Sequence, residues 1–205
     1  LEWSTEIKRL GVKANADNGR DARQALEFGA EGIGLCRTEH MFFDEERILD
    51  VRRMILADNV EEREAALETI LPHQLKDFTE LFEVMDGKTV CIRLLDPPLH
   101  EFLPQAEDAA EVAKDLGVTE ADLLRALETL HEFNPMLGHR GCRLAVTYPE
   151  ISVMQAKAII MAAIAVAKQG KVVKPEIMVP LISTIEELVY LKEFIKNTAD
   201  ALIAE

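Results

Sequence analysis

Short apolar segments alternate with longer amphipathic segments along this chain of 205 residues, and that alternation is its most constraining feature. The short segments predict β-strands and the long ones predict α-helices. A regular strand and helix alternation is typical of a parallel sheet covered by helices, either open or closed into a barrel. The expected strands are residues 12–16, 32–36, 89–95, 142–146 and 176–181.

The segments between the strands carry recognisable helix ends. Asp17 or Asn18 offers an N-cap for a helix that runs to residue 28. Thr184 caps the last helix, with Glu187 at the position that a capping box uses. Pro72 is expected to bend or divide its helix, because proline removes a backbone donor. The other expected helices are residues 45–56, 60–85 and 151–168, and a further helical stretch at 107–132 is divided by a stop at Gly117 and a new cap at Thr119.

The length of the chain and its strand number predict an incomplete barrel. A closed (β/α)8 TIM barrel has eight strands in about 250 residues. This chain offers about five, and its last helix shows no stop signal before residue 205. We therefore expect residues 11–205 to be a partial TIM-barrel domain with helical insertions, and residues 1–10 to be the end of an interdomain linker or helix.

The charge and hydropathy of the chain exclude several classes of partner. A formal net charge of −14 argues against a nucleic-acid or anionic-membrane surface. The most apolar stretch, residues 156–167, is interrupted by Lys157 and is shorter than the roughly 20 residues that span a bilayer. The three cysteines lack the spacing of a zinc site or a disulfide framework. We expect a soluble, cytoplasmic protein whose anionic ligands bind in a local basic pocket.

Arg37 is the first candidate for such a pocket. It directly follows the strand at residues 32–36, and the residue beyond a barrel strand faces the active-site mouth. Its planar guanidinium can donate two parallel hydrogen bonds to a phosphate or carboxylate. Alternatively, Arg37 pairs on the surface with Glu39 or Asp44.

Arg93 is the second candidate, because it lies inside an otherwise apolar strand. An unpaired guanidinium there would cost several kcal/mol, so an anionic group must meet it. Asp96 could be that group, as a structural ion pair. Asp96 could instead orient Arg93 while a bound anion takes the other face of the guanidinium.

The segment at residues 134–143 supplies a third arginine candidate, Arg140. Arg140 and Arg143 are expected on different faces of a strand, so that one of them faces the barrel mouth. His40 and His139 could act in proton transfer or could be structural. The sequence has no GxGxxG, P-loop or GxSxG motif, so nucleotide binding and serine hydrolysis find no support.

Four segments carry a resemblance to a known family. GVKANAD at residues 11–17, GAEGIGLCRTEHMFF at 29–43, CIRLLDPPLHEFLP at 91–104 and NPMLGHRGCRL at 134–144 occur in order. Together they resemble the N-terminal part of the C-terminal PEP/pyruvate-binding barrel of the pyruvate phosphate dikinase family. Phosphoenolpyruvate (PEP) synthase and enzyme I of the sugar phosphotransferase system share the broader pattern, but the run LLDPPLHEF favours the dikinase.

The resemblance implies a phosphotransferase that interconverts ATP, phosphate and pyruvate with AMP, diphosphate and PEP. The phosphoryl group passes through a phosphohistidine on a separate, swivelling domain, and the barrel handles the pyruvate half-reaction. By motif, Arg37 and Arg93 resemble the arginines of the family that bind PEP, and Asp96 resembles the aspartate beside them.

The resemblance also implies that catalysis needs residues outside this chain. The family's Mg²⁺ ligands and its proton-donor cysteine lie on later strands, beyond residue 205. We therefore expect no metal ligand and no catalytic residue here, and an inactive fragment. Three cysteines do not lie in the motif of that proton donor: Cys36, Cys91 and Cys142.

The partners implied are PEP or pyruvate, the phosphohistidine and ATP-binding domains of the parent enzyme, and a second copy through the barrel domain. Two alternatives stay open. The chain could come from a related PEP synthase-like phosphotransferase. It could also be a catalytically silent binding or dimerisation module that uses the helical insertions at residues 45–85 and 107–132.

Overall fold

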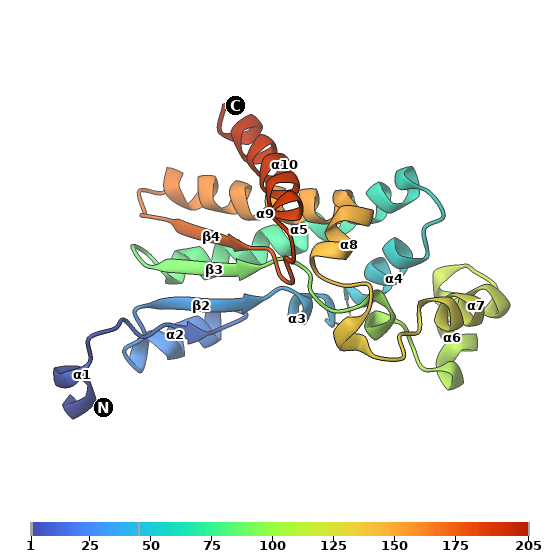
Figure 1. Cartoon of the computed structure of the whole chain (residues 1–205), viewed down its shortest axis with the longest axis horizontal. Helices are drawn as coiled ribbons and strands as arrows, with labels where there is room; N and C mark the ends of the chain where they lie inside the picture. Colours follow the sequence, from blue (N-terminus) through green and yellow to red (C-terminus); the bar gives the residue numbers. More distant parts are fainter. Residues whose placement is uncertain (1, 45, 205) are drawn as a thin grey trace.

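A computed structural model describes residues 2–44 and 46–204, and within them four strands form one parallel sheet. The order in the sheet is β1-β2-β3-β4, so strands that follow one another along the chain are neighbours (Figure 1). The structure therefore confirms four of the five expected strands. Their bounds are Ala14–Asn15 for β1, Gly32–Arg37 for β2, Thr89–Arg93 for β3 and Lys174–Met178 for β4.

The strand predicted at residues 142–146 is wrong, because this segment is the helix α8, Cys142–Thr147. Its buried residues are Cys142, Leu144 and Ala145, a spacing that one face of a helical turn satisfies as well as a strand does. Five residues are too few for periodicity to separate the two. Arg140 and Arg143 therefore do not lie on opposite faces of a strand.

The other helices agree with the expected order, although their ends shift by a few residues. The predicted start at residue 45 lies outside the described residues, and α4 begins at Ile48. Pro72 does not divide α5, which is one continuous helix. The helices are α1 Glu2–Ile7, α2 Gly19–Glu27, α3 Glu39–Phe42, α4 Ile48–Leu56, α5 Val60–Val84, α6 Ala109–Leu116, α7 Glu120–Leu130, α9 Pro149–Lys168 and α10 Ile185–Ala204, with 3-10 turns η1 Leu99–Phe102, η2 Ala106–Asp108 and η3 Pro135–Leu137.

The predicted caps are confirmed at both ends of the chain. The Asn18 side chain accepts a hydrogen bond of 2.8 Å from the backbone N–H of Asp21, which starts α2. Glu187 accepts from the backbone N–H of Thr184, and Thr184 accepts from that of Glu187. This reciprocal pair is a capping box before α10.

The main core lies between one face of the sheet and three helices, α2, α5 and α9. Buried side chains of β2 and β3 meet those of α5 and α9 there. Helix α9 is long and apolar enough to cross a membrane by length and composition, but half of its most apolar window is buried inside the protein. It is therefore packed as a core helix. Residues of this core include Ile33, Val90, Ile92, Phe78, Leu81, Ile159 and Ala162.

The other face of the sheet carries a long-range ion pair. Lys13, just before β1, places its Nζ 3.3 Å from an Oε of Glu176 in β4. The Lys13 side chain passes close to Gly34 of β2, where a Cβ would lie 3.1 Å from the Lys13 Cβ. Side chains from the two outer strands meet in this way when a sheet curves toward that face.

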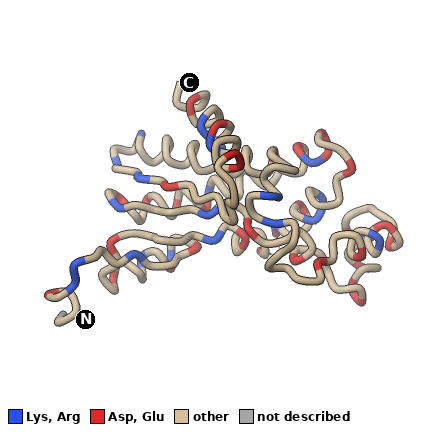
Figure 2. Tube along the Cα trace, in the orientation of Figure 1, with Lys and Arg blue, Asp and Glu red and all other residues tan. Residues whose placement is uncertain are grey.

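A second buried cluster supports the loops that follow β2 and β3. Phe42 of α3 packs against Phe102 of η1, with ring centroids 6.0 Å apart, and both are fully buried. Helices α6 and α7 pack together into a separate small subdomain beside this cluster. Helix α1 projects from the opposite end of the sheet (Figure 1). Acidic residues are spread along the whole trace rather than gathered on one element (Figure 2).

Candidate anion-binding site

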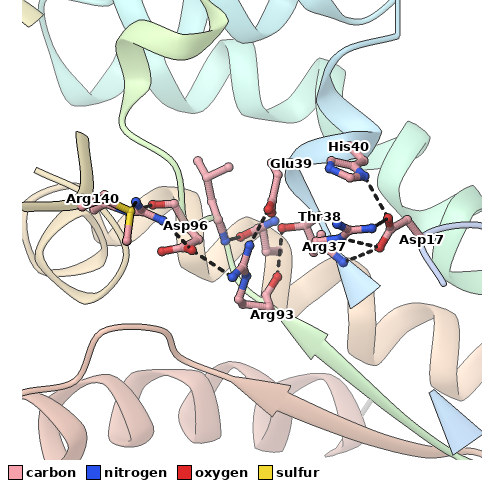
Figure 3. Close-up of polar contacts among 11 residues, drawn as sticks. Asp17, Arg37, Thr38, Glu39, His40, Arg93, Asp96 and Arg140 are labelled. Atoms are coloured by element: carbon pink, nitrogen blue, oxygen red, sulfur yellow. Dashed lines mark hydrogen bonds and ion pairs between the residues drawn. The ribbon is translucent and has the colours of Figure 1, made fainter. Parts of the chain in front are cut away.

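The candidate site lies where β2 and β3 end, at the carboxyl edge of the sheet. Arg37 is the last residue of β2 and Arg93 the last of β3, and their Cα atoms are partners in the sheet register. The prediction that the two arginines reach neighbouring strand ends is therefore confirmed. Their guanidinium groups turn toward different carboxylates (Figure 3).

Arg37 pairs with Asp17, which follows β1. An Oδ of Asp17 lies 2.8 Å from Nη2 of Arg37, and the other accepts a 2.8 Å hydrogen bond from the Arg37 backbone N–H. His40 Nδ1 lies 2.8 Å from the same carboxylate. Burial alone would raise the pKa of Asp17, but the hydrogen bonds and charges of Arg37 and His40 hold it below its ordinary value. Asp17 is therefore ionised at neutral pH.

Arg93 lies between two buried carboxylates. Its Nη1 is 2.9 Å from Oδ2 of Asp96, and its Nη2 donates to Oε1 of Glu39. Glu39 is 6% exposed and Asp96 is 3% exposed. The buried hydroxyl of Thr38 donates to the backbone carbonyl of Arg93 at 2.9 Å, which ties the loop after β2 to the end of β3.

Arg140 reaches the same Asp96 from the loop before α8. Its Nη2 lies 2.7 Å from Oδ2, the oxygen that also contacts Arg93. The backbone carbonyl of Asp96 accepts from Arg140 Nε at 3.2 Å and from the backbone N–H of Gly141 at 3.0 Å. Asp96 therefore links two arginines that are 47 positions apart in the sequence.

The result is a charge-balanced network rather than a purely basic pocket. Three arginines meet three carboxylates, so their formal charges cancel. Three buried polar atoms of the network have no hydrogen-bond partner among the described residues: Nε of Arg93, Oε2 of Glu39 and Oδ1 of Asp96. These atoms keep unused hydrogen-bonding capacity inside the network.

The predicted ion pairs are confirmed in part. Asp96 does pair with Arg93, as expected for either of its two proposed roles. The surface pairing of Arg37 with Glu39 or Asp44 is wrong, because its partner is Asp17. The sequence did contain a signal for Asp17, since it directly follows a strand and so lies at the same sheet edge.

Glu39 and Thr38 are the residues whose roles sequence reasoning missed. Both are polar and follow the end of a strand, a position where polar side chains are usually exposed. Both are nevertheless buried. Pairing of Glu39 with Arg93 depends on the β2 and β3 register, which no spacing along the chain reveals.

Neither histidine candidate gains a clear role in proton transfer. His40 lies beside Asp17 at the edge of the site. His139 instead contacts the hydroxyl of Thr147 at 3.0 Å and lies beside the ring of Tyr148.

Residues 2–44 and 46–204 bring together no group of three or more His, Cys, Asp and Glu side chains that could hold a metal ion. The described residues alone therefore supply no complete set of protein ligands for a metal ion. Burial raises the pKa of all three cysteine thiols, so they stay protonated at neutral pH and are poor nucleophiles.

A large hollow lies away from Arg37, Arg93 and Arg140. It measures about 1110 Å³ and is lined by the first half of α5 and the start of α9. A smaller hollow of about 210 Å³ adjoins Asp17 and His40 at the edge of the site.

The fold and the candidate site together show which class of protein this chain belongs to. This is a parallel α/β domain with arginines at the carboxyl edge of its sheet, where α/β proteins commonly bind anionic ligands. The family described as PEP-utilising enzyme, PEP-binding domain, matches residues 1–205, and the chain belongs to it.

Three curated relatives align with the whole chain. It is 54% identical to pyruvate, phosphate dikinase of Rhizobium meliloti over 207 residues, and 48% identical to that of Clostridium symbiosum. It is 51% identical to the chloroplastic pyruvate, phosphate dikinase 1 of Arabidopsis thaliana. The chain spans 22–24% of the length of these three relatives.

Proposed function

We propose that this chain is part of a pyruvate, phosphate dikinase and contributes part of its PEP/pyruvate site. The observation that carries the proposal is the pair of arginines in register at the ends of β2 and β3. The names and identities of the relatives support the same reaction. The complete enzyme would convert ATP, phosphate and pyruvate to AMP, diphosphate and PEP.

The four strands would be consecutive strands of a (β/α)8 barrel. Their sequential, all-parallel order supports this, because an open doubly wound sheet reverses its strand order at a switch point. The packing of α2, α5 and α9 against one face supports it too, as does the ion pair of Lys13 and Glu176 across the other face. The ends of β2 and β3 would then open into the barrel mouth.

The arginines would act by positioning and by neutralising charge. In the pyruvate half-reaction, the bond from phosphorus to a histidine nitrogen breaks as a bond from phosphorus to the enolate oxygen forms. Arg93 and Arg37 would hold the negative phosphoryl oxygens and the substrate carboxylate, and Asp96 would align Arg93 and Arg140.

The remaining chemistry would come from outside this chain. Mg²⁺ and the residue that protonates the enolate carbon would be supplied there, as would the phosphohistidine and ATP-binding domains. A homodimer through the barrel domain and a cytoplasmic location belong to the same proposal.

Replacing Arg93 by alanine in a full-length dikinase that carries this segment tests the role of the site. We expect PEP formation from the phosphohistidine enzyme and pyruvate to fall at least about 100-fold, because a preorganised charge is lost. Phosphorylation of the histidine by ATP should continue at the wild-type rate. Rapid-quench measurement of each half-reaction checks both.

Arg125→Ala is the matched control, because Arg125 is an exposed arginine of α7 whose one ion-pair partner among the described residues is Asp122, at 3.2 Å in the same helix. It should leave both half-reactions unchanged. An equal loss of both half-reactions in Arg93→Ala would contradict the assigned role. Wild-type rates of PEP formation in Arg93→Ala would favour the silent module instead.

A further inference from the structure

Glu39 is a buried carboxylate with an incomplete set of contacts. It begins α3, two residues after Arg37, and is only 6% exposed. Its Oε1 accepts a hydrogen bond from Nη2 of Arg93, while its Oε2 has no hydrogen-bond partner among the described residues. Burying a carboxylate in this way costs free energy, so its position calls for a physical reason.

The backbone holds Glu39 at a defined place relative to Arg93. The neighbouring Thr38 is fully buried, and its hydroxyl donates to the carbonyl of Arg93 at 2.9 Å. Strands β2 and β3 also pair as far as Arg37 and Arg93, with one register shift between Ile33 and Cys36. The Glu39 side chain and the Arg93 side chain therefore start from backbones that are fastened together (Figure 3).

The two carboxylates beside Arg93 hold different nitrogens of its guanidinium. Asp96 contacts Nη1 at 2.9 Å and Glu39 contacts Nη2. Asp96 also contacts Arg140, whereas Arg93 is the one ion-pair partner that Glu39 has in the described part of the chain. Without Glu39, the guanidinium would be held at one end only and could rotate about that contact.

The charge of Glu39 opposes the binding of an anion, so simple affinity does not explain its presence. A carboxylate beside the arginine repels phosphate and competes for its N–H donors. Any benefit of Glu39 to the reaction therefore has to come from orienting the guanidinium of Arg93. Such orientation matters most at the transition state.

We propose that Glu39 is a positioning residue that sets the orientation of Arg93 for phosphoryl transfer, at some cost in affinity for the anionic substrate. This inference rests on the proposed function. It predicts a separation of rate from affinity: loss of Glu39 slows the reaction without weakening PEP binding.

The test uses Glu39→Gln in the full-length dikinase, since glutamine keeps the shape of the side chain and removes its charge. We expect single-turnover transfer from the phosphohistidine to pyruvate to slow at least about tenfold, because a small misplacement of a binding group reduces transition-state stabilisation. The Kd for PEP, measured by calorimetric titration, should be unchanged or lower. Glu39→Asp keeps the charge but withdraws the carboxylate by one methylene, and it should slow transfer with Kd kept as well.

Glu150→Gln is the matched control. Glu150 forms an ion pair of 2.7 Å with Arg63, and both side chains are 10% exposed, so its burial resembles that of Glu39. It lies beside the large hollow and away from the three arginines. Its loss should lower stability without changing the transfer rate or the Kd for PEP.

Several outcomes would overturn the inference. Wild-type transfer rates in either Glu39 variant would show that orientation by this carboxylate is not needed. A weakening of the PEP Kd as large as in Arg93→Ala would make Glu39 part of binding itself. An equal loss of ATP-driven histidine phosphorylation would assign Glu39 to the stability of the protein and not to the orientation of Arg93. If Arg93→Ala also keeps wild-type rates, the proposed function fails; if only the Glu39 variants do, the inference alone fails.

Discussion

Gly141 shows how a single residue shapes the candidate site. Its backbone has φ +57° and ψ −126°, which L side chains rarely adopt. A Cβ there would lie 3.1 Å from the carbonyl oxygen of Pro180 and 3.2 Å from Oδ1 of Asp96. The turn also brings the Gly141 N–H to the Asp96 carbonyl. The absence of a side chain therefore lets the loop of Arg140 close on Asp96.

We expect Gly141→Ala to destabilise the protein by about 2–4 kcal/mol, because backbone strain and crowding add. Gly170→Ala is the control, since Gly170 has φ +88° but open space around it. It should cost only about 1–2 kcal/mol for its left-handed backbone. Urea denaturation of each variant gives the difference in unfolding free energy. Equal costs at the two positions would contradict the crowding argument.

At the scale of elements, α5 is the clearest departure from local sequence preference. Pro72 lies near the middle of this 25-residue helix. Proline cannot donate the backbone hydrogen bond that the helix needs there. The helix continues because its buried residues, Phe78, Leu81 and Phe82 among them, pack against the sheet and α9. Tertiary packing therefore outweighs the local cost.

We expect Pro72→Ala to stabilise the protein, by roughly 1–3 kcal/mol. The gain in helix propensity is about 3 kcal/mol, and the more flexible unfolded chain offsets part of it. The exposed position of Pro72 leaves little packing to lose. A rise in the urea midpoint at unchanged slope would confirm this, and a fall would show that proline itself is required there.

At the scale of the whole molecule, the four-stranded sheet has two open edges. β1 and β4 each have one neighbouring strand, so the backbone N–H and C=O groups on their outer edges form no hydrogen bonds within the sheet. Exposed apolar side chains accompany the β4 edge and α10, including Met178, Ile185 and Val189. An edge and an apolar surface together favour association.

We therefore expect the 205-residue chain, expressed alone, to self-associate or to have a low melting temperature. Light scattering coupled to size-exclusion chromatography measures the first, and thermal denaturation followed by circular dichroism measures the second. A strictly monomeric chain with a cooperative transition in the usual range of about 45–65 °C would contradict this expectation.

Local patterns along the chain determined most of the secondary structure and the candidate arginines. Caps such as Asn18 and Thr184, and the apolar strands before Arg37 and Arg93, act within a few residues of the chain, so the sequence alone revealed them. The segment after Gly141 was misassigned because five residues fit both a strand and a helix.

Only the tertiary structure decided which charges meet. The pairs Asp17 with Arg37, Glu39 with Arg93 and Asp96 with Arg140 join residues 20, 54 and 44 positions apart. Their contacts follow from the parallel register of the strands and from the turn before α8, neither of which spacing along the chain encodes. Folding therefore converted an expected basic pocket into a charge-balanced network, because the buried carboxylates of Glu39 and Asp96 need cationic partners.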